Sequence, residues 1–203
     1  TYISLQKLFH PGWLFGLFVV MIPFYLILTV ARSHNIEYLN GIFEMKNASM
    51  PIFVSQPYIY IANNYDNFNC LVGALPGHSF GLKGLFPLWA LSGLKFFFPQ
   101  LINFPIYVDK TELTTLTLFY DSYYDFGWIG VLLFSCILGA IAYILVVKLR
   151  EMRNPLGYLL YAQFAAYLML SFFTTWFSNT TTWFYLILTG IMALFYHLRA
   201  SRW

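Results

Sequence analysis

Two aspartates, Asp121 and Asp125, stand among aromatic residues in the segment FYDSYYDFGWIG at residues 119–130. Because they are four residues apart, a helix would place both carboxylates on one face. A carboxylate at the outer edge of a membrane could act as a general base or bind sugar hydroxyls. Alternatively, both acids could favour the dipole of a helix in its first turn, while Gly127 and Gly130 allow close helix packing. The sequence leaves both interpretations open.

Two basic residues, each with a histidine close by, are candidates for binding an anion. Arg32 and His34 follow the first long apolar stretch, and a guanidinium fork is well matched to a diphosphate. Alternatively, Arg32 only reaches the lipid headgroups. Lys83 and His78 lie in a glycine-rich segment, where the backbone could approach a ligand and the ammonium could meet a phosphate. The alternative there is a turn that leads into a helix at the membrane surface.

The segment SQPYIYIANNYDNFNCLVGAL, residues 55–75, alternates aromatic residues with Asn and Asp at roughly helical spacing. One helix face would be apolar and aromatic, formed by Tyr58, Ile61, Tyr65, Phe68 and Val72. The amides would crowd another side. Aromatic rings pack on the apolar faces of sugars and amides bond sugar hydroxyls, so this segment is a candidate sugar-binding surface. Its candidate substrate-binding residues are Tyr60 and Asn67.

Several kinds of chemistry have no motif in this sequence. It contains no glycine-rich phosphate-binding loop, no HExxH, no GxSxG and no paired CxxC. The two cysteines, Cys70 and Cys136, lie in unlike segments and do not suggest a disulfide framework. We therefore expect no metal and no other cofactor. A formal net charge of only +3 also gives no reason to expect nucleic-acid binding.

The elements that must position these residues are membrane helices. Of the 203 residues, 60% are hydrophobic and 9% are charged, and the mean hydropathy is +0.65, which is unusual for a soluble domain. A membrane-spanning helix needs about 20 mostly apolar residues. Four stretches meet or approach that length without a charge: residues 13–30, 128–147, 156–177 and 183–198. The sequence therefore predicts an all-α polytopic membrane protein.

The placement of lysine and arginine predicts the orientation of these spans, because both are enriched on the cytoplasmic side. Basic residues follow the second and fourth spans, namely Lys148, Arg150, Arg153, Arg199 and Arg202. With four spans they share one side, so residues 31–126 form a large outer segment. Within it, residues 85–108 are apolar but hold Lys95 and three prolines, and we expect half-helices on or dipping into the outer leaflet. We expect one membrane domain over residues 1–203, as the C-terminal part of a longer chain.

Four motifs follow one another along most of the chain. They are Arg32 after a helix end, YIYIANNYDNFNCL at residues 58–71, FGLKGLFPLW at residues 80–89 and TLFYDSYYDFGWIGVLLFSCILG at residues 117–139. In this order they resemble the C-terminal half of the bacterial oligosaccharide repeat-unit polymerases of the Wzy type. The most specific part of the resemblance lies in the last motif, where the aspartate, phenylalanine and glycine at 125–127 begin a span.

The resemblance implies an enzyme that joins polyprenyl-diphosphate-linked oligosaccharides at the outer face of the bacterial cytoplasmic membrane. The growing glycan would pass, without a metal, from its lipid diphosphate to the non-reducing end of another lipid-linked repeat unit. Arg32 would bind the diphosphate, and Asp125 or His78 would take the proton of the acceptor hydroxyl. Further substrate contacts would come from His34, Tyr60, Asn67, Lys83, Thr117, Tyr120, Asp121 and Tyr124. The protein would work among membrane lipids with a chain-length regulator and a flippase.

Other classes of membrane protein remain as alternatives. O-antigen ligases share the acidic, aromatic start of the helix but commonly carry a histidine shortly before it, and residues 114–121, TTLTLFYD, contain none. A flippase or another transporter should carry buried charges within several spans, whereas the predicted spans here are nearly free of charge. A non-catalytic scaffold is the third alternative, against which the order of the motifs argues.

Overall fold

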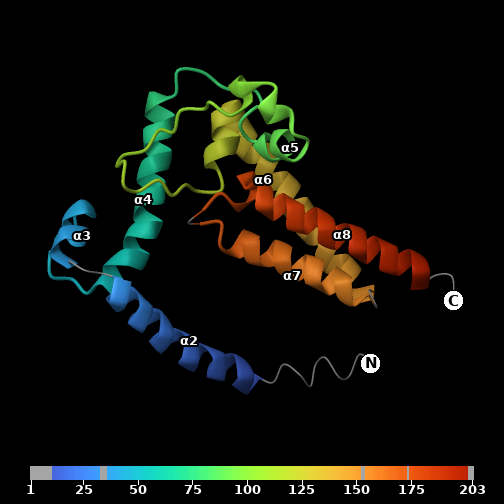
Figure 1. Ribbon diagram of the computed structural model, residues 1–203, viewed down its shortest axis with the longest axis horizontal. Coiled ribbons are helices and arrows are strands. Elements are labelled where there is room, and N and C mark those ends of the chain that lie inside the picture. Colours follow the sequence, from blue (N-terminus) through green and yellow to red (C-terminus); the bar gives the residue numbers. More distant parts are fainter. Residues whose placement is uncertain (1–10, 33–35, 152–153, 173, 201–203) are drawn as a thin grey trace. The chain divides into compact units, whose positions relative to one another are not determined.

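The computed structural model describes residues 11–32, 36–151, 154–172 and 174–200. Within these residues the regular structure is helical and no strand is present, so the all-α prediction is confirmed for this part of the chain. The α-helices are α2 (Pro11–Arg32), α3 (Ile36–Ile42), α4 (Ile52–Ala74), α5 (Phe86–Leu91), α6 (Tyr120–Glu151), α7 (Pro155–Met169) and α8 (Thr180–Ala200) (Figure 1). Short 3-10 helices are η1 (Leu94–Phe96), η2 (Pro99–Leu101) and η3 (Trp176–Ser178).

The chain packs as two compact units, Thr1–Tyr60 and Ile61–Trp203. The first unit holds α2, α3 and the first turns of α4. In it, the buried side chain of Asn40 in α3 donates to the carbonyl oxygens of Ala48 and Met50 at 2.8 and 2.7 Å. These two bonds fix the connection that leads into α4. The second unit holds the remainder of α4 and all later helices.

Two helices of the second unit, α6 and α8, are long and apolar enough to cross a membrane. Their apolar segments, Tyr120–Lys148 and Thr180–Arg199, contain the spans predicted at residues 128–147 and 183–198. The helix α2, of 22 residues, holds a further apolar segment at Phe15–Leu28. The described residues thus hold two candidate membrane spans rather than the four predicted, which indicates association with a membrane.

Within the span predicted at residues 156–177, the helix α7 ends at Met169, so this span stays a prediction. The 15 residues of α7 extend about 22 Å, at about 1.5 Å per residue, which is less than the roughly 30 Å of a hydrocarbon core. Beyond α7 the backbone has other partners, since the carbonyl oxygen of Ser171 accepts the N–H of Leu118 at 3.1 Å. The chain therefore turns into η3 instead of continuing as a helix.

A core of large apolar residues joins the last three α-helices, with Leu138 from α6, Phe164 from α7, Phe177 from η3 and Leu186 from α8. The helices α7 and α8 lie side by side (Figure 1). Asn154 caps α7 by accepting the N–H of Leu156 at 3.0 Å, and its amide donates to the carbonyl oxygen of Ala193 in α8 at 2.7 Å. One side chain thus starts α7 and fastens it to its neighbour.

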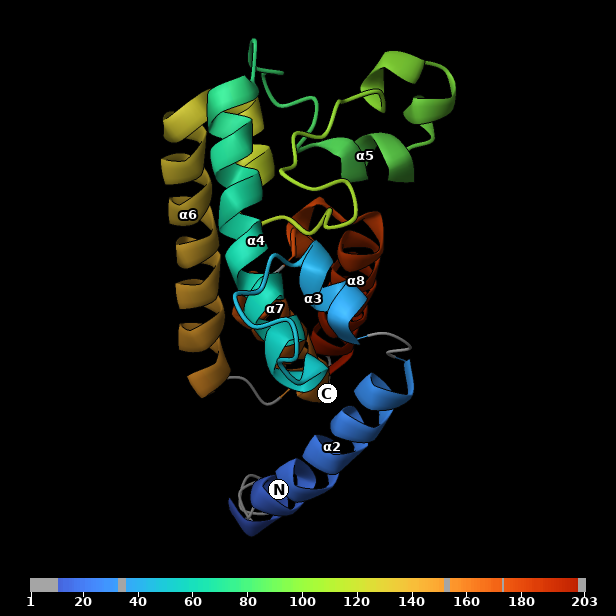
Figure 2. The same ribbon diagram turned by 90° about the vertical axis from the view of Figure 1, so that its left-hand side faces the viewer.

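For the apolar stretch at residues 85–108, we predicted short helices and no span, and no span is present there. It folds into α5, η1 and η2, none longer than six residues, with prolines in the first turn of α5 and of η2. The helix α5 packs near the beginning of α8 (Figure 2). A second core cluster, formed by Leu71, Tyr120 and Tyr124, joins α4 to the start of α6. These contacts gather distant segments around the first turns of α6.

Candidate functional site

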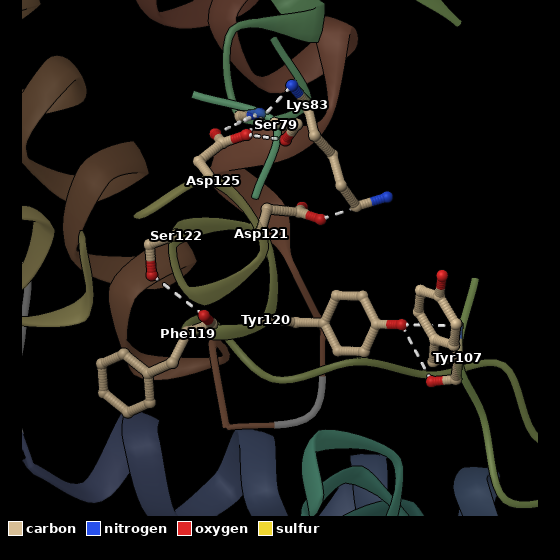
Figure 3. A network of polar contacts seen from close by, with 9 residues as sticks. Ser79, Lys83, Tyr107, Phe119, Tyr120, Asp121, Ser122 and Asp125 are labelled. Atoms are coloured by element: carbon tan, nitrogen blue, oxygen red, sulfur yellow. Dashed lines mark hydrogen bonds and ion pairs between the residues drawn. The ribbon is translucent and has the colours of Figure 1, made fainter. Parts of the chain in front are cut away.

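The carboxylate of Asp125 is enclosed by a turn of residues 79–84. The hydroxyl of Ser79 and the backbone N–H of Lys83 donate to its Oδ1, the latter at 3.2 Å, and the backbone N–H of Gly84 donates to Oδ2 at 2.7 Å (Figure 3). Only 4% of Asp125 is exposed. Since three donors occupy both oxygens, the geometry favours a structural role for Asp125 in holding this turn. Its predicted role as a general base stays a prediction.

The helix α6 breaks directly after Asp125, at Phe126 and Gly127. Gly127 has φ 62° and ψ −148°, a conformation that residues with a side chain rarely adopt. A Cβ on Gly130 would overlap the carbonyl oxygen of Ser122, on the other side of this break. Gly130 thus allows the helical segments before and after the break to approach each other, and its packing against a separate helix stays a prediction.

Asp121, one turn before Asp125, has a different partner. Its Oδ1 lies 3.5 Å from Nζ of Lys83, and the two side chains are 10% and 13% exposed (Figure 3). The side chain of Ser178 in η3 lies beside the same carboxylate. The residues Lys83 and Asp121, here called the Lys83–Asp121 pair, place an ammonium and a carboxylate side by side at the start of a candidate span.

Aromatic rings surround the ammonium of this pair. Nζ of Lys83 lies 4.9 Å from the ring centroid of Tyr124 and 5.8 Å from those of Tyr120 and Phe104. Cation–π attraction to ring faces stabilises a charge in such a site. The arrangement combines one cation, one anion and several aromatic faces.

Two residues predicted to bind substrate are used within the fold. The amide of Asn67 donates to the carbonyl oxygens of Leu113 and Thr115, both at 2.8 Å, and accepts the N–H of Asp109 at 2.9 Å. The hydroxyl of Tyr120 accepts the N–H of Tyr107 at 2.7 Å and donates to that residue's carbonyl oxygen at 2.8 Å. Both side chains are fully buried. They hold the segment between η2 and α6 against α4 and α6.

The remaining candidates of the second unit lie close to the same turn. His78 is exposed, and its Nδ1 lies 3.3 Å from the carbonyl oxygen of Tyr124. Thr117 is buried, and its hydroxyl has no partner among the described residues. The fold thus brings His78, Thr117 and the Lys83–Asp121 pair to the first turns of α6 or just before them.

The candidates of the first unit stay untested. Arg32 is the last residue of α2, but its side chain and all of His34 lie outside the described residues. Tyr60 lies on α4 and is 39% exposed. Further along α4, the predicted face at Ile61, Tyr65 and Val72 is exposed. On the amide side, Asn63, Asn64 and Asn67 are buried, whereas Asp66 and Asn69 are exposed.

Sequence analysis missed a hollow between α5 and the connection from α7 to α8. It has a volume of about 330 Å³ and is lined by Phe86, Thr174, Thr175, Trp176, Ser178, Asn179 and Thr180. The run TTWFSNTTT at residues 174–182 was a usable signal, because it gathers hydroxyl and amide side chains between two apolar helices. Among the described residues, no group of three or more His, Cys, Asp or Glu side chains could hold a metal ion.

No protein-family model, no curated protein and no solved structure matches this chain.

Proposed function

We propose that this chain is part of a membrane glycosyltransferase that polymerises lipid-linked oligosaccharide repeat units. The observation that carries the proposal is the Lys83–Asp121 pair among aromatic rings, at the first turn of an apolar helix long enough to span a bilayer. The substrate is a polyprenyl-diphosphate-linked glycan. Its diphosphate needs a cation, its sugars need polar and aromatic groups, and its lipid needs an apolar surface. These three kinds of group are adjacent in this region.

The reaction assigned to this site is a single displacement. A hydroxyl oxygen of the acceptor sugar attacks the anomeric carbon of the donor, and the bond from that carbon to the diphosphate breaks with its electron pair on the diphosphate. The ammonium of Lys83 stabilises the charge on this leaving group. The hydroxyl proton passes to the carboxylate of Asp121, and the anomeric configuration inverts. Asp121 replaces Asp125 as first choice for the base because the oxygens of Asp125 already accept three donors.

Arg32 keeps its proposed role of binding the diphosphate, and His78 is kept as an alternative base. The exposed ring of His78 lies beside the turn that carries Lys83. Thr117, with a buried hydroxyl that has no partner among the described residues, is a candidate donor or acceptor for a sugar hydroxyl. Each of these roles can be tested by substitution in the same assay as the pair.

The proposed setting is the bacterial cytoplasmic membrane, with spans at residues 13–30, 128–147, 156–177 and 183–198 and with the residues from α3 to the start of α6 on the outer side. Lys148 ends the apolar segment of α6 and Arg199 ends that of α8, as expected if both helices end at the cytoplasmic face. Asn154, at the start of α7, bonds to Ala193 near the same end of α8. A flippase would deliver the repeat units, and a chain-length regulator would be the second partner.

The test is an electrophoretic profile of the envelope glycans and of the lipid-linked pool from cells that lack the parent gene. We expect surface glycan that stops at one repeat unit, and full-length chains after complementation with the wild-type gene. Long chains retained on the lipid carrier would instead indicate a ligase. Repeat units trapped on the inner side would indicate a flippase, and an unchanged profile would overturn the glycan hypothesis.

A further inference from the structure

The hollow between α5 and the connection from α7 to α8 is a second place where a ligand fits. Its volume of about 330 Å³ falls at the lower end of the roughly 300–1,000 Å³ that small-molecule sites occupy. Phe86 of α5 forms one part of the wall, and the rest comes from residues just before and at the start of α8. The hollow is thus built from segments about 90 residues apart, counted from Phe86 to the lining threonines.

The lining of the hollow selects a class of ligand. Of its seven residues, five carry a hydroxyl or amide group, two are aromatic, and none is charged. Hydroxyls and amides exchange hydrogen bonds with a neutral ligand that has many hydroxyl groups, and aromatic rings cover the apolar faces of such a ligand. A phosphate or a carboxylate would need a cation in the wall. The lining therefore fits a sugar ring rather than an anion.

Two polar groups of the wall have unused bonding capacity. The indole Nε1 of Trp176 is buried and has no acceptor among the described residues. Asn179 uses its Oδ1 to accept the N–H of Thr181 at 2.9 Å, as the N-cap of α8, while its NH₂ group donates to no described residue. A buried donor without an acceptor costs free energy. Asn179 is exposed, so a hydroxyl oxygen of a sugar in the hollow can reach its NH₂ group.

The hollow is connected to the Lys83–Asp121 pair through one side chain. Ser178 lines the hollow, and its side chain also lies beside the carboxylate of Asp121. A ligand in the hollow would therefore lie one residue away from the carboxylate proposed as the base. No corresponding contact joins the hollow to Asp125, whose described partners come from residues 79–84.

We infer that this hollow is a carbohydrate subsite, which holds a neutral sugar ring of the glycan beside Asp121. The inference rests on the proposed function and extends it, because it separates the place that binds sugar from the place that binds diphosphate. Lys83 meets the anionic part of the substrate, and the residues of η3 and the first turn of α8 meet its uncharged part.

Photo-crosslinking of the parent protein in its own cells tests this inference. The variant Phe86→p-benzoylphenylalanine places the reactive group in the wall of the hollow, and the same substitution at Phe96, which is 77% exposed, is the matched control. After irradiation, we expect an adduct that stains for carbohydrate at Phe86 and not at Phe96. The double substitution Thr175→Val and Thr180→Val should reduce the adduct about tenfold, as expected for two lost hydrogen bonds.

The outcomes separate this inference from the proposed function. An adduct without carbohydrate, equal staining at both positions, or full staining in the double valine variant would overturn the subsite. If the cells that lack the gene also make glycan chains of normal length, the polymerase proposal fails, while a carbohydrate adduct at Phe86 would still establish the subsite. Each purified variant is treated with protease and run on a gel, and resistance to the protease shows that the variant is folded.

Discussion

Asp121 and Asp125 lie one turn apart on α6, yet their surroundings differ. Asp125 accepts three donors from residues 79–84, two of them backbone N–H groups. Asp121 instead meets side chains, with the ammonium of Lys83 at 3.5 Å and the hydroxyl of Ser178 beside it. A carboxylate bonded to backbone groups cannot release them without unfolding the turn. A carboxylate bonded to side chains can exchange its partners when a substrate enters.

The same difference separates two larger regions of the molecule. Around Asn67 and Tyr120, the amide and the hydroxyl bond to the backbone and fix the segment that precedes α6. Around the hollow, Trp176 and Asn179 carry donors that no described residue accepts. The amide of Asn67 and the hydroxyl of Tyr120 are thus bonded within the fold, whereas the donors at the hollow have capacity for a ligand. The following predictions test this contrast, from the largest expected effect to the smallest.

Substitution of Asp125 should have the largest effect. Asp125→Ala leaves the donors of Ser79, Lys83 and Gly84 without their acceptor, and we expect a loss of about 3–5 kcal/mol in the free energy of unfolding. The thermal midpoint and protease resistance of the solubilised protein measure it. Asp66→Ala, at an exposed position of α4, is the control and should change neither. A stable Asp125→Ala variant with normal protease resistance would show that the turn does not depend on this carboxylate.

Substitution of Lys83 should abolish chain growth with a smaller loss of stability. Lys83→Met keeps the backbone N–H that bonds to Asp125 but leaves Asp121 nearly buried without its cation, so we expect a loss of about 2–3 kcal/mol. Adding Asp121→Asn should restore most of the stability but not the glycan length. Lys95→Met, which removes a cation over the ring of Phe96, is the control. Restored chain growth in the double variant would exclude the pair from the mechanism.

Substitution of Gly127 tests the break in α6 that separates the two aspartates from the span. Gly127→Ala forces a residue with a side chain to adopt φ 62° and places a Cβ 3.1 Å from Nε2 of His78, at an expected cost of about 2 kcal/mol. Gly139→Ala, in a regular part of α6 with no atom within 4 Å of the new Cβ, should be neutral or slightly stabilising. Equal thermal midpoints for the two variants would mean that the break relaxes without strain.

The sequence predicted the parts of this arrangement that depend on local pattern. The charge-free runs of α6 and α8 identified both candidate spans, and the prolines with Lys95 excluded a span at residues 85–108. The end of α7 could not be predicted, because the apolar run continues past Met169, and the residues beyond it bond to a distant segment, as Ser171 does to Leu118. Local composition gives no signal for such a partner.

The site was predicted in part for the same reason. The spacing of Asp121 and Asp125 placed both on the first turns of α6, but their partners are about 40 residues away in the turn that carries Lys83. Sequence pattern therefore could not tell which carboxylate is saturated. It also assigned Asn67 and Tyr120 to the substrate, because an aromatic and amide composition is the same whether these groups bond to a sugar or to the backbone.

Tyr120 offers the smallest and sharpest test of that ambiguity. Tyr120→Phe keeps the buried ring that faces Lys83 and removes only the hydroxyl that bonds to the backbone of Tyr107, so we expect a loss of about 1 kcal/mol in stability. Glycan length should not change, since this hydroxyl has no capacity left for a sugar. Tyr143→Phe, at a 71% exposed position of α6, is the control for the substitution itself. Shortened glycan with an unchanged thermal midpoint would show that the hydroxyl of Tyr120 contacts the substrate. The amide of Asn67 would then be structural, whereas the hydroxyl of Tyr120 would belong to the ligand-binding groups.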